Sequence, residues 1–298
     1  MRLDDLDPSN NVRDLGSGGG GGGGGFPIFG LLPLLLGRGM GCGGIGLLVI
    51  VGLAYMMFSG GGGMLGGGQS VAPTSESRSG GATSGAAVCN TEERLFSCRV
   101  LASTEQVWGR IFQQSGQRYE APTLNFYTKG ARSGCGYASS AAGPYYCPPD
   151  RGLFLDTSFF DELQNRFGAK GDFAEAYVIA HEVGHHIQNL TGASDQVQRI
   201  QQSGSRAEGN AASVRLELQA DCYAGVWAKQ SGRLEPGDIE EGLTAANAIG
   251  DDTLQRQSGG EVVPDSFTHG SSAQRQKWLR RGLEAGDPAA CDTFSGAI

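Results

Sequence analysis

The stretch AYVIAHEVGHHIQNLTG, residues 176–192, determines how the rest of the sequence is interpreted. It contains HEVGH, in which His181 and His185 stand four residues apart. Residues at this spacing lie one turn apart on the same face of a helix, so both imidazoles can reach one metal ion. Zinc is the usual occupant of such a pair. Glu182, beside the first histidine, can then face a water on the metal and act as a general base.

Chance is a poor explanation for this motif, because the chain has four histidines and three of them fall in HEVGHH. The alternative is a buried helix whose histidines hydrogen-bond within the core. That alternative would be preferred for a lone histidine, but not for His181, Glu182 and His185 in register on a capped helix. His186 lies off the shared face, so we expect it behind the ligands or at the surface.

The residues around the motif predict a helix. Asp172 and Glu175 have the spacing of an amino-terminal capping box, and Gly192 suits the carboxyl-terminal stop. Gly184 lowers helix propensity by about 1 kcal/mol relative to alanine, and a glycine inside such a helix often lets another segment come close. The apolar residues lie on more than one side, as in a helix buried in a domain core, and are Tyr177, Val178, Ile179, Val183 and Ile187.

Length and charge limit the possible classes of protein. A chain of 298 residues predicts one catalytic domain with an appendage. The net charge of -8 gives no footprint for nucleic acid. The acidic balance favours solubility and says little about the substrate.

The first 88 residues are interpreted as the appendage. Residues 1–40 are polar and then glycine-rich, and we expect them to be disordered. Residues 41–58 are uncharged and just long enough to cross a bilayer, which predicts a single-pass transmembrane signal anchor with the amino terminus inside. Residues 59–88 predict a flexible linker. The domain is then residues 89–298, tethered to the membrane and lying outside the cytoplasm on the envelope side.

The cysteines support that compartment. The chain has seven, of which Cys42 lies in the apolar amino-terminal region and six form an even set in the domain. None has the CxxC spacing of a zinc knuckle, so we favour disulfides over six unrelated buried thiols. Closeness in sequence predicts the pairs Cys89–Cys98 and Cys135–Cys147, and elimination leaves Cys222–Cys291.

The patterns in the domain predict an α+β fold, mainly helical with a small β-sheet. Apolar periodicity and capping spacing predict the helices, and short β-prone runs predict the strands. Between these elements, 130–150 is expected to be a loop and 193–212 a polar connection. The expected helices are 90–114, 158–167, 172–192, 212–229, 238–249 and 271–285, and the expected strands are 121–128 and 153–155.

A catalytic zinc takes three protein ligands, and HEVGH supplies two. The third is sought in RLELQADCYAG, residues 215–225, where Glu217 and Asp221 stand one turn apart, opposite an apolar stripe. The alternative for this pair is a solvated acidic face. Either carboxylate could approach the metal. Glutamate has the longer reach, and a metal-bound histidine usually donates its other ring N–H to a carboxylate or carbonyl, so one residue can serve each role.

Four stretches together resemble the putative neutral zinc metallopeptidase family, the YpfJ-type proteins of bacteria. They are HEVGHH, ELQAD, THGSSAQRQKWL at 268–279 and CGYASSAAGPYYCPPDRGLFLDTSFF at 135–160. The Glu-x-x-x-Asp pattern is also similar to that of gluzincin peptidases. The resemblance implies a zincin-like domain with one zinc ion, Glu217 as third ligand and Asp221 as the partner of His181.

The expected activity is hydrolysis of peptide bonds in a peptide or protein substrate, with Glu182 as general base. His269 is the candidate donor to the oxyanion, and Tyr223 is a second candidate whose apolar surroundings favour a core role. A structural or surface role for His269 is equally consistent with its sequence. Two other functions remain open. One is a non-catalytic, zinc-stabilised envelope domain that binds proteins, and the other is a hydrolase of a different amide bond.

Overall fold

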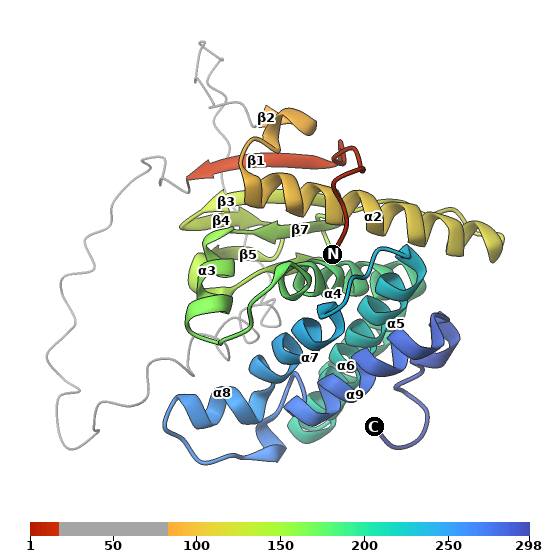
Figure 1. Ribbon diagram of the computed structural model, residues 1–298. Coiled ribbons are helices and arrows are strands. Elements are labelled where there is room, and N and C mark those ends of the chain that lie inside the picture. The colour runs from red at the N-terminus through yellow and green to blue at the C-terminus, as the bar shows by residue number, and fades with distance from the viewer. Residues whose placement is uncertain (18–82) are drawn as a thin grey trace, which may run out of the picture.

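The computed structural model describes residues 1–17 and 83–298 (Figure 1). This part of the chain is rich in helix and holds a small sheet, so the predicted α+β class is confirmed. Its helices are α2 (Glu92–Gln114), α3 (Ser158–Asn165), α4 (Asp172–Thr191), α5 (Ala193–Ser203), α6 (Arg206–Ser231), α7 (Asp238–Ala248), α8 (Asp251–Gln257) and α9 (Ser272–Ala285).

The main sheet has five strands in the order β2-β1-β3-β7-β6. The three inner strands are parallel, and each edge strand pairs antiparallel with its neighbour. A separate hairpin joins two further strands within the stretch predicted as a loop. The sheet strands are β1 (Val12–Ser17), β2 (Thr83–Ser84), β3 (Thr123–Thr128), β6 (Tyr145–Cys147) and β7 (Gly152–Leu155), and the hairpin is β4 (Gly130–Ser133) with β5 (Gly136–Ser139).

The inner strands β3 and β7 are buried on both faces, which explains their nearly continuous apolar sequence. Phe126 and Leu155 are register partners and face the main core. Tyr127 and Phe154 face a smaller core beside the β4–β5 hairpin. The alternation between the two cores follows the two-residue period of a strand.

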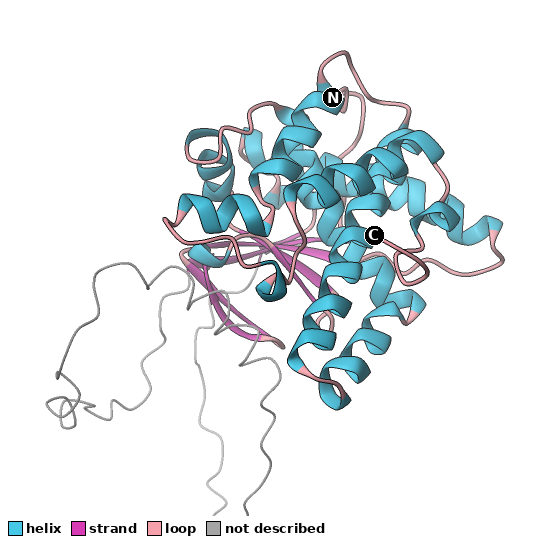
Figure 2. Cartoon of the chain, turned by 90° about the horizontal axis from the view of Figure 1, so that it is seen from below, coloured by secondary structure: helices cyan, strands magenta, loops and turns pink. Residues whose placement is uncertain are grey.

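Helix α4 lies between the sheet and the remaining helices. It contacts β6, β7 and α2 on one side and α6 and α7 on the other. In Figure 1 the helices α5–α9 lie below α4, and Figure 2 shows the strands gathered together, with helices above them and to their right. This central position buries α4 on most of its surface, as its apolar residues on several sides predicted.

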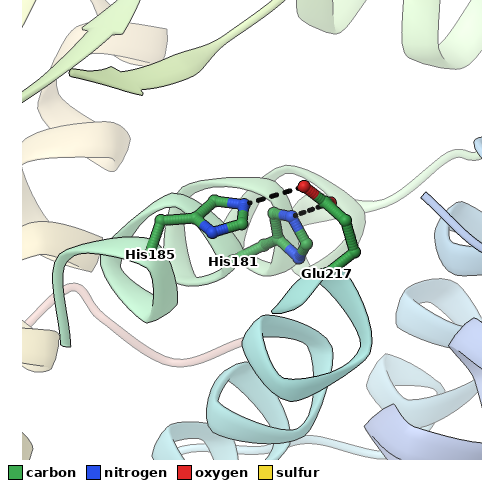
Figure 3. A group of neighbouring side chains, drawn as sticks. All are labelled: His181, His185 and Glu217. Carbon is green, nitrogen blue, oxygen red and sulfur yellow. Dashed lines mark hydrogen bonds and ion pairs between the residues drawn. The ribbon is translucent and has the colours of Figure 1, made fainter. Parts of the chain in front are cut away.

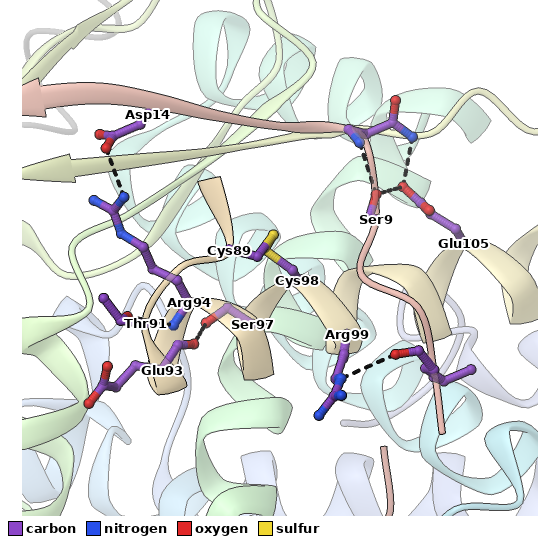
Figure 4. Close-up of a disulfide and its surroundings, with 12 residues drawn as sticks. Ser9, Asp14, Cys89, Thr91, Glu93, Arg94, Ser97, Cys98, Arg99 and Glu105 are labelled. Atoms are coloured by element: carbon purple, nitrogen blue, oxygen red, sulfur yellow. Dashed lines mark hydrogen bonds and ion pairs between the residues drawn. A yellow bond between two sulfur atoms is a disulfide. The ribbon is translucent and has the colours of Figure 1, made fainter. Parts of the chain in front are cut away.

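The amino-terminal segment corrects one prediction. Residues 1–40 were expected to be disordered, but residues 1–17 pack on the domain and place β1 between β2 and β3. Polar contacts to α2 hold this segment (Figure 4): Arg94 binds Asp14, and the Glu105 carboxylate accepts from Ser9 and Asn11. Buried Leu3, Leu6 and Val12 supply the apolar contacts. Polar neighbours separate these three apolar residues and only Val12 lies in β1, so no strand pattern marks the segment in the sequence.

The predicted anchor at 41–58 lies outside the described residues, as does most of the predicted linker at 59–88. Among the helices of residues 1–17 and 83–298, none is both long enough and apolar enough to cross a bilayer.

The three predicted disulfides are confirmed. Cys89 pairs with Cys98 and Cys135 with Cys147. The third disulfide joins Cys222 of α6 to Cys291, which is 69 residues further along the chain. The Cα–Cα distances of 6.3, 5.8 and 5.6 Å lie in the range that a disulfide requires. Cys42 is outside the described residues.

One predicted connection and one predicted helix cap are wrong. The stretch 193–212, expected to be a polar connection, forms α5 and the first turns of α6. Ser205 and Glu208 make the capping box that starts α6, and buried Val197 fixes α5 against it. At the start of α4, Asp172 and Glu175 do not form the expected cap. The Phe173 amide instead donates to the Glu241 carboxylate of α7, a contact that local sequence cannot reveal.

Helices α6 and α9 cross at glycines. A Cβ on Gly282 would lie 2.0 Å from the backbone oxygen of Cys222, and one on Gly225 would lie 2.3 Å from that of Leu279. Both distances are far below van der Waals contact, so the two backbones meet directly here. The crossing sets how closely α9 approaches α6.

We predict that Gly282→Ala destabilises the protein although alanine favours helix. Overpacking against a backbone typically costs about 1–3 kcal/mol or more, which outweighs a propensity gain of about 1 kcal/mol. Gly109→Ala in α2 is the matched control, because a Cβ there meets nothing within 4 Å. Urea denaturation should show a lower midpoint for Gly282→Ala and an equal or higher one for Gly109→Ala. Equal midpoints for both variants would contradict the close crossing.

Candidate metal centre

Helices α4 and α6 bring three candidate ligands together (Figure 3). The Nε2 atom of His181 lies 3.2 Å from one carboxylate oxygen of Glu217, and that of His185 lies 3.4 Å from the other. One ligand atom from each residue lies within 4.8 Å of the other two. The predicted set His181, His185 and Glu217 therefore shares one location, with both imidazoles pointing at the Glu217 carboxylate.

Gly184 allows α6 to approach this closely. A Cβ at Gly184 would meet the Cα and the backbone oxygen of Ala220 at 3.0 Å, tighter than an ordinary contact. Ala220 is three residues beyond Glu217, on the neighbouring turn of α6. The expectation that this glycine lets another segment come close is thus confirmed, and the segment is the one that carries Glu217.

The outer nitrogen of His181 is held by Asp221, as predicted for this pair. Its Nδ1 lies 2.8 Å from the Asp221 carboxylate, which is fully buried. The same carboxylate accepts from the Tyr177 hydroxyl at 2.6 Å and from two nitrogens of Arg275 at 2.8 and 2.9 Å. Burial opposes its charge, but the Arg275 guanidinium and His181 keep the pKa of Asp221 below its usual value.

Arg275 is a contributor that the sequence argument missed. It comes from α9, is 3 % exposed, and reaches Asp221, Tyr177 and the His181 ring. The residue lies in the THGSSAQRQKWL stretch, which was quoted for the family resemblance without a role for this arginine. No local pattern marks this pair, because 54 residues separate Arg275 from Asp221 in the chain.

The carboxyls of Glu217 and Glu182 respond to the same surroundings in opposite ways. Burial opposes the charge of Glu217, but His185 and His269 hold its pKa well below the usual range. Burial raises the pKa of Glu182, although the neighbouring His185 and His181 lower it. Glu182 is buried and lies in the field of the three candidate ligands, yet it is not one of the three side chains that converge.

His269 is positioned by Asp251, a second residue that the sequence argument missed. One oxygen of the Asp251 carboxylate accepts from the backbone amides of Thr268, His269 and Gly270, and the other lies 3.2 Å from the His269 ring. Burial lowers the pKa of His269, but the charges of Glu217 and Asp251 raise it overall. The charge of Glu217 acts on His269, so this residue lies near Glu217.

Two predicted neighbours lie elsewhere. His186 is fully buried, where its Nε2 donates to the Glu120 backbone oxygen and its Nδ1 accepts from the Tyr146 hydroxyl. It therefore joins α4 to β6 and is not at the surface. Tyr223 packs edge-on against Trp108 and lines a groove of about 690 Å³. None of the three candidate metal ligands lines this groove. This position agrees with its apolar stripe and removes it as an oxyanion donor.

The donor set suits zinc. Two imidazole nitrogens and one carboxylate oxygen are ligands that zinc accepts, and three protein ligands leave a coordination position open. Because Asp221 and Gln188 engage the outer nitrogens of His181 and His185, both rings present Nε2 to Glu217. Within residues 1–17 and 83–298, no fourth histidine, cysteine, aspartate or glutamate joins this group.

The chain is similar to a protein family and to proteins of known sequence. A family model described as putative neutral zinc metallopeptidase matches residues 1–294. Uncharacterized protein YpfJ of Escherichia coli (strain K12) is 53% identical over 210 residues, which are 70% of this chain and 73% of that protein.

A mycobacterial protein is similar at lower sequence identity. Uncharacterized protein Rv2575 of Mycobacterium tuberculosis is 46% identical over 221 residues, covering 68% of this chain and 72% of that protein. No solved structure matches the chain.

We predict that zinc affinity rises with pH up to about 9. Burial lowers the pKa of His181, but the charge and hydrogen bond of Asp221 and the contact with Glu217 raise it to about 9 overall. Below that pH a proton occupies the ring and has to leave before Nε2 can bind a cation. Competition with a chromophoric chelator between pH 6 and 9 measures this dependence. An affinity that stays constant over this range would contradict it.

The two carboxylates of α6 should differ in their effect on zinc. We predict that Glu217→Ala nearly abolishes zinc binding, because it removes a candidate ligand. Asp221→Ala should cost about 10- to 100-fold, the typical effect of losing the partner of a metal-bound histidine. Chelator competition on each purified variant measures the order. The reverse order would exchange the two roles, and unchanged affinity in both would place the third ligand elsewhere.

Proposed function

Because this chain belongs to the putative neutral zinc metallopeptidase family, we propose that it is a zinc-dependent peptidase that hydrolyses peptide or protein substrates. His181, His185 and Glu217 would hold one zinc ion, and Glu182 would act as general base. The observation that carries this proposal is the position of Glu182: a buried carboxylate beside three converging ligands, but outside them. A purely structural zinc site has no use for such a group.

A bound zinc ion would act as a Lewis acid: it would polarise the scissile carbonyl and lower the pKa of the water bound to it to about 7. Glu182 accepts the proton of the attacking water and later delivers it to the leaving amine. Burial raises the pKa of the Glu182 carboxyl, and a carboxyl with a raised pKa is better suited to take a proton and return it.

His269 would donate to the oxyanion. Asp251 holds the Nδ1 side of the ring, so Nε2 is the atom left to face the substrate. The charges of Asp251 and Glu217 favour the protonated ring, which is the form that donates. Asp251 thereby positions His269, as Asp221 positions His181.

The second candidate function is a non-catalytic zinc-stabilised domain that binds other proteins in the envelope. A structural zinc site is normally closed by four protein ligands. The described residues offer three at this location, which favours the open, catalytic kind of site. Hydrolysis of an amide bond outside a peptide uses the same groups, and a substrate screen separates it from peptidase activity.

We also propose that the domain lies outside the cytoplasm, at the membrane. Three disulfides support an oxidising compartment. The apolar stretch 41–58 supports association with a bilayer.

The fold restricts how such an anchor is arranged. Residues 1–17 contribute β1 between β2 and β3, so they lie on the same side of any membrane as residues 83–298. A single crossing would place the two parts on opposite sides. We therefore infer that the predicted single-pass arrangement with the amino terminus inside does not suit this protein, and that an anchor would begin and end on the side of the domain.

For catalysis, we predict that Glu182→Gln binds zinc like the parent and loses hydrolysis, because the ligands stay while the base is removed. The control is Glu175→Gln, on the same helix but outside the centre. An unbiased peptide-library digest with and without chelator, together with metal analysis, measures both properties. A Glu182→Gln variant that cleaves as fast as the parent would remove Glu182 from the mechanism.

For topology, we predict that Asp7→Cys and Glu261→Cys react alike with a membrane-impermeant maleimide in intact cells, in a Cys42→Ser background. Both positions are exposed on the domain. If the domain lies outside the cytoplasm, both cysteines are labelled. Labelling at one position only would show that the two ends of the segment 18–82 lie on opposite sides.

A further inference from the structure

We propose that Gln188 and Gln219 form a buried relay that positions His185 and sets which ring nitrogen meets the metal. This inference rests on the proposed function, because it treats His185 as a ligand. It assigns positioning roles to two glutamines outside the three ligands and the general base.

The relay is continuous from the imidazole to a backbone carbonyl near the end of the chain. His185 Nδ1 lies 2.8 Å from Gln188 Oε1, and Gln188 Nε2 donates to the Leu216 backbone oxygen at 2.6 Å. The same Nε2 donates to Gln219 Oε1 at 3.2 Å. Gln219 Nε2 in turn donates to the Cys291 backbone oxygen at 3.1 Å. Every step joins a donor to an acceptor.

The two backbone carbonyls determine the direction of the relay. A carbonyl oxygen only accepts, so Leu216 requires the NH₂ group of Gln188 on its side and turns Oε1 toward His185. Cys291 orients Gln219 in the same way, and the oxygen of Gln219 then faces Gln188. Because Oε1 of Gln188 can only accept, Nδ1 of His185 has to carry a hydrogen. Nε2 is then the ring nitrogen that faces Glu217.

Burial makes this arrangement costly to break. Gln188 is 0 % exposed and Gln219 is 7 % exposed. A buried amide without its partners loses about 1–3 kcal/mol per group. The Cys222–Cys291 disulfide holds the last acceptor against α6, the helix that carries Gln219. Alternative rotamers would leave donors unpaired, so the ring of His185 is held in one orientation.

The relay differs in charge from the support of His181. His181 is held by a carboxylate whose charge Arg275 balances, whereas His185 is held by a neutral amide. Neither support adds net charge to the centre. When both rings are neutral, as metal binding requires, Glu217 is the one charged residue among the three converging ligands.

The first test measures zinc affinity of full-length variants by chelator competition. Gln188→Met keeps the size of the side chain but removes the acceptor, and we expect an affinity about 10- to 100-fold lower. Gln219→Met leaves the Leu216 contact in place and should cost less. Gln276→Met is the matched control, because its amide donates to the Leu243 backbone oxygen at 2.9 Å between α9 and α7. Equal affinities for Gln188→Met and Gln276→Met would overturn the relay.

The second test observes the Nδ1–H signal of His185 by nitrogen-15 NMR, with zinc and without it. The parent should show this hydrogen protected from exchange with solvent, and Gln188→Met should lose the protection under conditions in which the variant is still folded. A parent without a protected Nδ1–H would overturn the relay. Failure of the parent to bind zinc would instead refute the proposed function, and the NMR result would still decide the relay.

Discussion

The centre depends on one buried negative charge, the carboxylate of Asp221. It is completely enclosed and joins three helices, because it accepts from Tyr177 and His181 of α4 and from Arg275 of α9 while belonging to α6 itself. An unpaired charge in this position would be strongly destabilising. The helices are therefore held in the one arrangement that satisfies it, and that arrangement also brings Glu217 to the two histidines.

Glycines allow the helices to come close enough to pair the Asp221 carboxylate. Gly184 admits α6 to the surface of α4, and Gly225 with Gly282 admits α9 to α6. Close backbone approach is what lets short bonds of 2.6–2.9 Å form between residues on different helices. The cost in helix propensity at each glycine, about 1 kcal/mol, is offset by packing and by the pairing of the buried charge.

Each candidate functional histidine is thus held by a partner on its outer nitrogen, and the partners differ in kind. His181 meets a carboxylate, His185 an amide and His269 a second carboxylate. Asp221 of α6 holds His181 of α4, and Asp251 of α8 holds His269, which lies in the loop before α9. Gln188 instead shares α4 with His185 and is fixed by α6. The disulfide at Cys291 links the end of the chain to the same network. The geometry of the candidate metal centre accordingly depends on how the helices pack.

The sequence by itself determined those features whose residues lie close together in the chain. The HEVGH helix, the Glu217–Asp221 pair and the two short-range disulfides depend on neighbours within a few turns or one loop, so their patterns are visible in the sequence. The tertiary structure alone decided the place of residues 1–17, the cap of α4 by Glu241 and the roles of Arg275, Asp251 and Gln219. These contacts join residues distant in the chain, and a single buried side chain among polar neighbours leaves no periodic signal. Its partner is determined only when the helices and the sheet have packed.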